Sequence, residues 1–482
     1  MINIHKQTPL FDALEQYRKE NPVSCHVPGH KNGIVCHDKG TNIFQQLLQI
    51  DATEVEGLDD LHAPEGAILE AEQLLSKLYK SQKSYFLING STSGNLAMVL
   101  GNCEAGDVVL VQRNCHKSIL HALMLAKATP IFLQTNINKE WGTAEGLSIN
   151  VVQKAIKAYP KAKAMILTYP SYYGVGENLE AIISLAHKHD ITVLVDEAHG
   201  AHFTGREPFL KSSLAYGADY VVQSAHKTLP AMTMGSYLHV NHAVTNYKKV
   251  EMYLQMLQSS SPSYPIMVSL DLARSYLGTL TDDDLLYTKT TIDEFKRELN
   301  KISGIRVLQH EEGVCDILKV TVQTDGTYSG YQLQSALRKC SIYSELADIK
   351  NILLVLPILK VGQTFSYDRI IFGMRKAVEL LKEKHQEKQV FAVLLEDVDD
   401  LTQLELSFAE MMNRETRSVP FSEAIDYIVA ETIVPYPPGV PYMIKGERIT
   451  EKKMAGLEQM LQFGTRFHSS SCLDERNILV YV

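Results

Sequence analysis

The chain has 482 residues, of which 45% are hydrophobic and 21% are charged, and its formal net charge is −9. This length and apolar content predict a large core and two or three domains or subdomains. The acidic balance argues against a nucleic-acid-binding protein, and no apolar run approaches the roughly 20 residues of a membrane span. The seven cysteines form no C-x-x-C pair and the N-terminus lacks a signal-peptide core, so we expect a reduced, cytoplasmic protein without a metal site.

Short apolar strand patterns alternate with helical patterns from about residue 84 to residue 240. The strand patterns are "YFLI" (85–88), "VVLVQ" (108–112), "PIFLQT" (130–135), "AMILTYP" (164–170), "TVLVDEAHG" (192–200), "YVVQSAHK" (220–227) and "GSYLHV" (235–240). Apolar strands separated by helices indicate an α/β fold with a largely parallel central sheet covered on both faces. Ligands in such folds bind beyond the carboxyl ends of the strands.

The alternation of strand and helix patterns stops after Pro262, where a long helical pattern begins. Helix and strand patterns alternate again near 278–385, and a polar charged stretch follows at 382–390. We expect an N-terminal arm at 1–45, a large domain at 46–277, a smaller α/β domain at 278–385 and a C-terminal α+β domain at 386–482.

The stretch "NGSTSGN" (89–95) joins the first strand to a helix. Ser91, Thr92, Ser93 and Gly94 would present hydroxyl and backbone N–H groups at the helix N-terminus, which is a natural phosphate site. A simple capped helix is the alternative, because serine and threonine are common caps. The spacing of a Walker P-loop is missing.

Asp196 ends an apolar strand in "VLVDEAHGAHF". A buried carboxylate is costly unless it meets a cation or hydrogen-bond donors, so Asp196 either caps the following turn or meets a positive group on a ligand. His199 and His202 follow without the spacing of a zinc motif. We expect His199 to pack or to contact a cofactor, and His202 to be structural.

Lys227 follows the end of a different strand in "VVQSAHKTLPAM". Most lysines are solvated, but this one has apolar neighbours, and a lysine near low-dielectric walls becomes a nucleophile for carbonyl groups. A phosphate site, a carboxylate and such a lysine together meet the needs of pyridoxal 5'-phosphate. His116, just after another strand, either lies on the cofactor ring or caps the next helix.

Eight stretches together resemble the bacterial-type Orn/Lys/Arg decarboxylases, a group with the aspartate-aminotransferase fold, also called fold type I. They are "CHVPGHKNG" (25–33), "VEGLDDLHAPEGAI" (55–68), "LINGSTSGN" (87–95), "VQRNCHKS" (111–118), "VDEAHGAH" (195–202), "QSAHKTL" (223–229), "SSSPSYPIMVSLDLAR" (259–274) and "YPPGVP" (436–441). They span nearly the whole chain in the family's order.

The resemblance implies a role for each site residue. Lys227 binds the cofactor's aldehyde, Asp196 pairs with the pyridinium nitrogen, His116 stacks on the ring and His199 lies near the ring's substituents. The phosphate is surrounded by Ser91, Thr92, Ser93, Ser224 and His226, and Ser261 reaches the phosphate in the partner subunit.

The resemblance also implies a homodimer, or a dimer-based tetramer, with active sites at the interface. The N-terminal wing domain of the long family members is expected to be missing, because "TPLFDALEQY" begins almost at residue 1. The implied reaction is decarboxylation of a basic L-amino acid, with arginine favoured over lysine and ornithine. Polyamine biosynthesis is the expected role, and acid consumption is the open alternative. Glu345 and Asp348 are candidates for binding a guanidinium group, although a solvated acidic turn explains them as well.

Two alternatives remain open. The first is another fold-type-I enzyme, such as a serine hydroxymethyltransferase or an aldolase-like enzyme, but these follow the lysine with a glycine- and arginine-rich tract where this chain has "PAMTMGSYL". The second is a non-catalytic decarboxylase relative. Such a protein could lose Lys227 or Asp196 and keep its fold, yet both residues are present.

Overall fold

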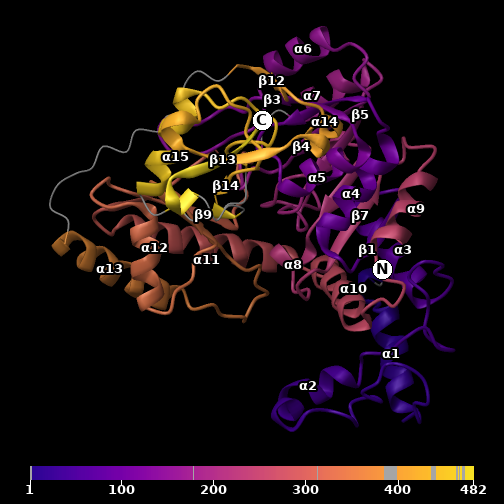
Figure 1. Cartoon of the computed structure of the whole chain (residues 1–482). Helices are drawn as coiled ribbons and strands as arrows, with labels where there is room; N and C mark the ends of the chain where they lie inside the picture. Colours follow the sequence, from indigo (N-terminus) through magenta and orange to yellow (C-terminus); the bar gives the residue numbers. More distant parts are fainter. Residues whose placement is uncertain are drawn as a thin grey trace. The chain divides into compact units, whose positions relative to one another are not determined.

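The computed structural model describes residues 3–176, 179–311, 313–384, 399–435, 441–462, 465, 467–468 and 473–482 (Figure 1). The chain divides into two compact units. The first unit comprises Met1–Asn102 and Val193–Asp282, and the second comprises Cys103–Thr192 and Asp283–Val482. The expected division into an arm and three domains stays a prediction, and its last boundary, at 385–386, lies outside the described residues. The same holds for most of the motif at 436–441.

Helices account for most of the regular structure. They are α1 (Pro9–Lys19), α2 (Thr41–Leu48), α3 (Ala67–Tyr79), α4 (Gly90–Asn102), α5 (Lys117–Ala126), α6 (Ile149–Ala158), α7 (Leu179–His187), α8 (Ala225–Thr228), α9 (Lys248–Leu257), α10 (Tyr264–Gly278), α11 (Asp282–Asn300), α12 (Gly330–Lys339), α13 (Tyr367–Lys384), α14 (Phe408–Asn413) and α15 (Glu451–Gln462). Among the helices described, none combines the length and the apolar character that crossing a bilayer requires.

The strands are short, as expected for α/β proteins. They are β1 (Lys83–Leu87), β2 (Val108–Gln112), β3 (Thr129–Leu133), β4 (Ala164–Thr168), β5 (Thr192–Asp196), β6 (Tyr220–Gln223), β7 (Ser236–Val240), β8 (Ile305–Val307), β9 (Lys319–Thr324), β10 (Leu346–Ala347), β11 (Asn351–Val355), β12 (Leu401–Gln403), β13 (Thr416–Pro420), β14 (Val434–Pro435), β15 (Phe467–His468) and β16 (Asn477–Tyr481). All seven strands predicted between residues 84 and 240 are present.

The first unit places its strands in the order β1-β7-β6-β5. β5 and β6 are parallel, whereas β7 is antiparallel to both β6 and β1. Helix α4 packs against β1, β6 and β7. Gly94 makes this close approach possible, because a Cβ atom at that position would lie 2.6 Å from a methyl group of Leu87 and 3.0 Å from one of Val222.

The second unit contains the strands β4-β2-β3-β12 and a separate four-stranded sheet in the order β10-β11-β9-β8. β2 is parallel to β3 and β4, and β12 joins the edge of β3 in the antiparallel direction. Helix α12 packs on β11 and β9 and lies beside α13 (Figure 1). The antiparallel pairs β13–β16 and β14–β15 complete the C-terminal part.

Parallel pairs in both units, separated by helices, confirm the α/β class that the strand patterns predicted. Those strands are rich in valine, isoleucine and leucine and are buried almost throughout, as parallel strands between helical layers should be. The antiparallel direction of β7 was not predicted. Residues 224–235, which connect it to β6, are long enough for a crossover, so the connection gave no sign of its direction.

Candidate active site

Helix α4 begins the site in the first unit. Gly90 has a φ of +76°, which lets the chain turn sharply from β1 into the helix. The buried Ser93 hydroxyl donates to the Gly90 carbonyl at 2.8 Å and closes the first turn, while Ser91 is half-buried and Thr92 is exposed. The N–H groups of a first helical turn have no partner within the helix, so this end can bind an anion.

Asp196 is 3% exposed at the end of β5. Its Oδ2 atom accepts a hydrogen bond from Nδ2 of Asn95 at 2.9 Å, and its Oδ1 atom accepts one from the backbone N–H of Ala198 at 3.2 Å. The carboxylate therefore caps the turn and is also held by α4. Sequence reasoning missed Asn95, although it lies one helical turn after Ser91 in the same motif.

Lys227 lies in the short helix α8, directly after β6. Its Nζ atom is 3.2 Å from Nε2 of His199, so the structure brings together the predicted nucleophile and the predicted neighbouring histidine. The ring Nδ1 of His226 donates to the Gly235 carbonyl at 3.1 Å. Burial lowers the pKa of His226, which keeps this imidazole neutral near pH 7.

The Ser224 side chain supplies a test of the expected cofactor. Ser224 is 0% exposed, and its hydroxyl has no hydrogen-bond partner among the described residues. An orphaned buried hydroxyl is costly, whereas a phosphate oxygen would satisfy it. Ser224, the N-terminus of α4, Lys227 and Asp196 therefore fit the chemical needs of pyridoxal 5'-phosphate.

Two other predicted site residues have local hydrogen bonds within their own segments. His116 belongs to the second unit, where it caps α5: its Nδ1 atom accepts from the backbone N–H of Ser118 at 3.2 Å. This bond uses the edge of the ring, and stacking on the cofactor stays a prediction. Ser261 is exposed in the loop before α10, and its backbone N–H donates to Ser259 at 3.2 Å.

Other residues of the recognised motifs are structural. His202 is buried between Phe203 and Phe209, with ring centroids 4.6 and 4.9 Å away, as expected for a packing residue. The Asp59 carboxylate accepts backbone hydrogen bonds at 2.8–3.3 Å from the chain that leads into α3 (from residues 65, 66, 68 and 69). These bonds give Asp59 a structural role at the start of α3.

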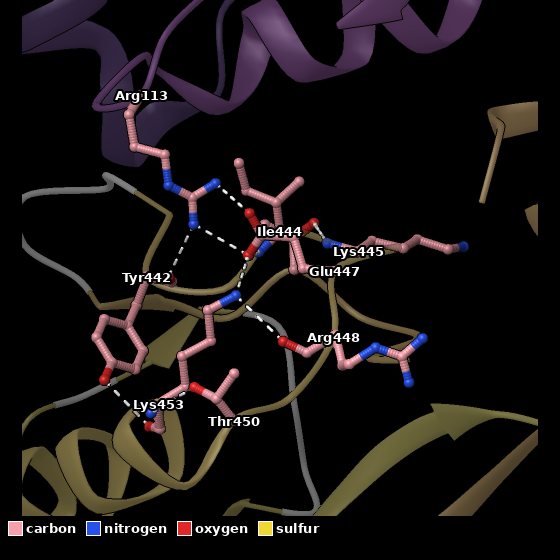
Figure 2. A network of polar contacts seen from close by, with 9 residues as sticks. Arg113, Tyr442, Ile444, Lys445, Glu447, Arg448, Thr450 and Lys453 are labelled. Carbon is pink, nitrogen blue, oxygen red and sulfur yellow. Dashed lines mark hydrogen bonds and ion pairs between the residues drawn. The ribbon is translucent and has the colours of Figure 1, made fainter. Parts of the chain in front are cut away.

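A separate polar network in the second unit joins the end of β2 to the C-terminal part of the chain (Figure 2). Arg113 makes a two-pronged ion pair with Glu447, and Lys453 Nζ reaches the same carboxylate at 3.0 Å. Burial raises the pKa of Glu447, but the charges of Arg113 and Lys453 outweigh burial and leave that pKa below its usual value. Sequence reasoning missed this network.

The acidic segment near residue 345 also lies in the second unit. The Asp348 carboxylate is occupied by hydrogen bonds within the protein. It accepts from the Tyr173 hydroxyl, from the backbone N–H groups of Lys350 and Asn351, and from the Asn351 amide. Glu345 is exposed and accepts from the Tyr172 hydroxyl at 2.9 Å. Of the two candidates for a guanidinium site, only Glu345 has a solvent-facing carboxylate.

Comparison with known proteins identifies relatives along the whole chain. Residues 8–320 match the family model described as Orn/Lys/Arg decarboxylase, major domain, and residues 385–469 match its C-terminal domain. The uncharacterized protein YaaO of Bacillus subtilis is 43% identical over 479 residues, which cover 98% of each chain. An arginine decarboxylase of Halalkalibacterium halodurans is 33% identical over 465 residues, covering 94% of this chain and 93% of the relative.

Solved structures show the same fold. The crystal structure of a lysine decarboxylase from Francisella novicida superposes with a TM-score of 0.81 at 21% identity, over 98% of this chain and 81% of that one. At this identity the likeness concerns the fold alone.

Proposed function

This chain belongs to the Orn/Lys/Arg decarboxylase family, and on that premise we propose that it converts L-arginine to agmatine and CO2. Family membership confirms the predicted fold type I, the predicted cofactor, pyridoxal 5'-phosphate, and the predicted enzyme class, an amino-acid decarboxylase. A basic amino acid is the substrate class of the family. The choice of arginine is the proposal.

The site residues support this reaction through the groups they hold in place. Bound pyridoxal 5'-phosphate supplies an electron sink for the electron pair left at the α-carbon when CO2 departs. In our proposal the amine of Lys227 holds the cofactor's aldehyde, and the Asp196 carboxylate, fixed by Asn95, keeps the ring nitrogen protonated. His199 Nε2, 3.2 Å from Lys227 Nζ, exchanges a proton with that amine.

Arginine is favoured by two relatives that are more than 30% identical to this chain and carry an assigned activity. The relative at 33% identity and a Bacillus subtilis relative, 32% identical over 95% of this chain and 94% of its own, are both called arginine decarboxylase. We also propose Glu345 as the partner of the substrate's guanidinium group, since a carboxylate binds a guanidinium with two parallel hydrogen bonds. Lysine is the second candidate, because more distant relatives are lysine decarboxylases.

The test is amine release by the purified protein with pyridoxal 5'-phosphate and L-arginine, L-lysine or L-ornithine, each in turn. We expect agmatine from arginine, and little cadaverine or putrescine. The Lys227→Ala variant should release none of the three. Cadaverine as the main product would replace arginine by lysine, and a protein that binds the cofactor but releases no amine would contradict the proposed function.

The same assay addresses the alternatives that the sequence left open. A non-catalytic relative would release no amine, and an aldolase-like enzyme would instead release an aldehyde and glycine from a β-hydroxy amino acid. We further propose a cytoplasmic homodimer that supplies agmatine for polyamine synthesis, with Ser261 reaching the partner's phosphate site and His116 stacking on the cofactor. Sedimentation of the Ser261→Ala protein with and without cofactor would test the dimer.

A further inference from the structure

A ladder of buried polar side chains crosses the first unit on the face of the sheet opposite α4. Glu197 follows β5, Gln223 ends β6, His239 lies in β7 and Ser84 lies in β1, and all four residues are at most 1% exposed. Gln223 Nε2 donates to Glu197 Oε1 at 2.6 Å, Gln223 Oε1 lies 3.0 Å from His239 Nε2, and His239 Nδ1 lies 2.7 Å from Ser84 Oγ. One hydrogen-bonded chain therefore joins four strands.

The direction of every bond in the ladder follows from its ends. The backbone N–H and the hydroxyl of Ser213 both donate to Glu197 Oε2, so Glu197 acts as an acceptor. The Gly200 carbonyl accepts from the same Gln223 nitrogen at 3.2 Å, so Gln223 presents its amide nitrogen to Glu197 and its oxygen to His239. His239 therefore carries its proton on Nε2 and accepts from Ser84 on Nδ1. Burial lowers the pKa of His239 to about 3, in agreement with this neutral ring.

The first two members of the ladder lie next to the ends of β5 and β6, which carry the expected cofactor contacts. Glu197 follows Asp196 directly, and Gln223 precedes Ser224 directly. Successive side chains of a strand point to opposite faces, so Asp196 faces Asn95 on α4 while Glu197 faces Gln223. The backbone agrees with this register, because the Glu197 N–H donates to the Val222 carbonyl at 2.8 Å.

We propose that Glu197 is a positioning residue: by holding Gln223 and Ser213, it fixes Asp196 and Ser224 at the spacing that the cofactor needs. This inference rests on the proposed function, because Asp196 and Ser224 are taken as cofactor contacts. Glu197 itself touches neither the substrate nor the cofactor in this proposal.

The donor and acceptor directions make a reciprocal exchange the sharpest test. Glu197→Gln must keep its oxygen towards Ser213 and so turns its NH2 group towards the NH2 group of Gln223. Gln223→Glu sets two carboxylates against each other. In the double variant, Gln at 197 donates to Glu at 223, which still accepts from His239. The exchange restores both bonds, but it sets an oxygen of the new glutamate against the Gly200 carbonyl, which now accepts from Gln223 Nε2 at 3.2 Å, so the recovery should be incomplete.

The measurements are the dissociation constant for pyridoxal 5'-phosphate, the visible absorbance of the bound cofactor, kcat and KM for the amino acid, and the urea midpoint of the cofactor-free protein. We expect each single variant to bind the cofactor about 10- to 100-fold more weakly, the range for a lost buried hydrogen bond to a charged group. The value of kcat should fall and KM should change little. The double variant should recover most of the affinity.

Glu72→Gln is the matched control. Glu72 is another buried carboxylate of the first unit, and it accepts from the backbone N–H of Phe86 in β1 at 2.9 Å, outside the ladder. This variant should change the urea midpoint but leave cofactor affinity within about 2-fold of the wild type, because a glutamine oxygen can still accept from the Phe86 N–H and the ladder is unchanged. Ser213→Ala, which removes only one donor to Glu197, is the milder variant if the others fail to fold, and it should weaken cofactor binding about 3-fold.

Two results would overturn the inference: cofactor affinity and kcat unchanged in Glu197→Gln or Ser213→Ala, or a double variant no better than the worse single variant. Failure of the proposed function looks different, since the wild type would then bind the cofactor but release no amine. In that case cofactor affinity and absorbance still test the positioning role.

Discussion

Two buried glutamates, one in each compact unit, have pKa values that are shifted in opposite directions. Glu197 is 0% exposed and Glu447 is 4% exposed. Burial raises the pKa of Glu197 to about 7, and hydrogen bonds from Ser213 and Gln223 only partly oppose this. The pKa of Glu447 is lowered, because Arg113 and Lys453 outweigh burial. Depth alone therefore does not decide the charge of a buried carboxyl group; the kind of donor around it does.

The difference separates two uses of a buried acid. A carboxylate held by neutral donors is directional, so it can fix the spacing of strand ends, but it costs stability when it is charged. A carboxylate held by two cations is charged at neutral pH and fastens distant parts of the chain, as Glu447 fastens the C-terminal part to the end of β2 (Figure 2). Removing a cation and changing the pH should therefore affect the two sites differently.

The largest effect is expected for Arg113→Met. This change leaves the Glu447 carboxylate buried with Lys453 as its remaining cation, and breaking a buried pair in this way costs about 3–5 kcal/mol. Urea unfolding should show the loss, and hydrogen exchange should quicken at residues 441–454. Lys154→Met is the control, because its pair with Asp400 is exposed and should contribute at most about 1 kcal/mol. An equal loss in both variants would contradict the comparison.

The next effect is a pH dependence of opposite sign at the two glutamates. The pKa of Glu197 rises from 4.5 to about 7 on folding, so the native state holds that proton more tightly. Its contribution to stability therefore falls as the pH rises from about 4.5 to about 7, by on the order of 3 kcal/mol in total. The lowered pKa of Glu447 gives a contribution that is present above pH 4.5 and is lost on acidification.

The measurement is the free energy of unfolding of the wild type, Glu197→Gln and Glu447→Gln between pH 4 and pH 8. As the pH rises, the free energy of unfolding of the wild type should fall relative to that of Glu197→Gln. It should rise relative to that of Glu447→Gln. Parallel curves would show that the two acids share one environment.

The smallest effect is expected for Lys453→Met. Lys453 is partly exposed, and Arg113 remains to pair with Glu447, so the loss should be about 1 kcal/mol. Unfolding in the Arg113→Met background sharpens the result, because Lys453 is then the remaining cation and its loss should cost more than in the wild type. Strict additivity of the two changes would mean that the cations do not share Glu447.

The sequence was informative wherever the signal is local. Strand patterns, the helix after residues 89–95 and the placement of Asp196 and Lys227 at strand ends all follow from neighbouring residues, and the structure confirms the elements. Asn95, the Glu197–Gln223 pair and the Arg113–Glu447 pair could not be predicted. Their partners are distant in the chain, and glutamate, glutamine and asparagine are usually solvated, so nothing local marks them as buried. His239 was missed for the same reason.

The adjacent residues Asp196 and Glu197 have one further consequence. Both are acidic and lie on opposite faces at the end of β5, so the type of side chain alone does not distinguish the correct register there from a slip by one residue. The two positions have different partners, Asn95 for Asp196 and Gln223 for Glu197, and glutamate reaches one methylene further than aspartate. Asp-Glu and Glu-Asp would then be unequal at this site, although they have the same composition and charge. A substitution matrix that scores the exchange as conservative would misjudge it here.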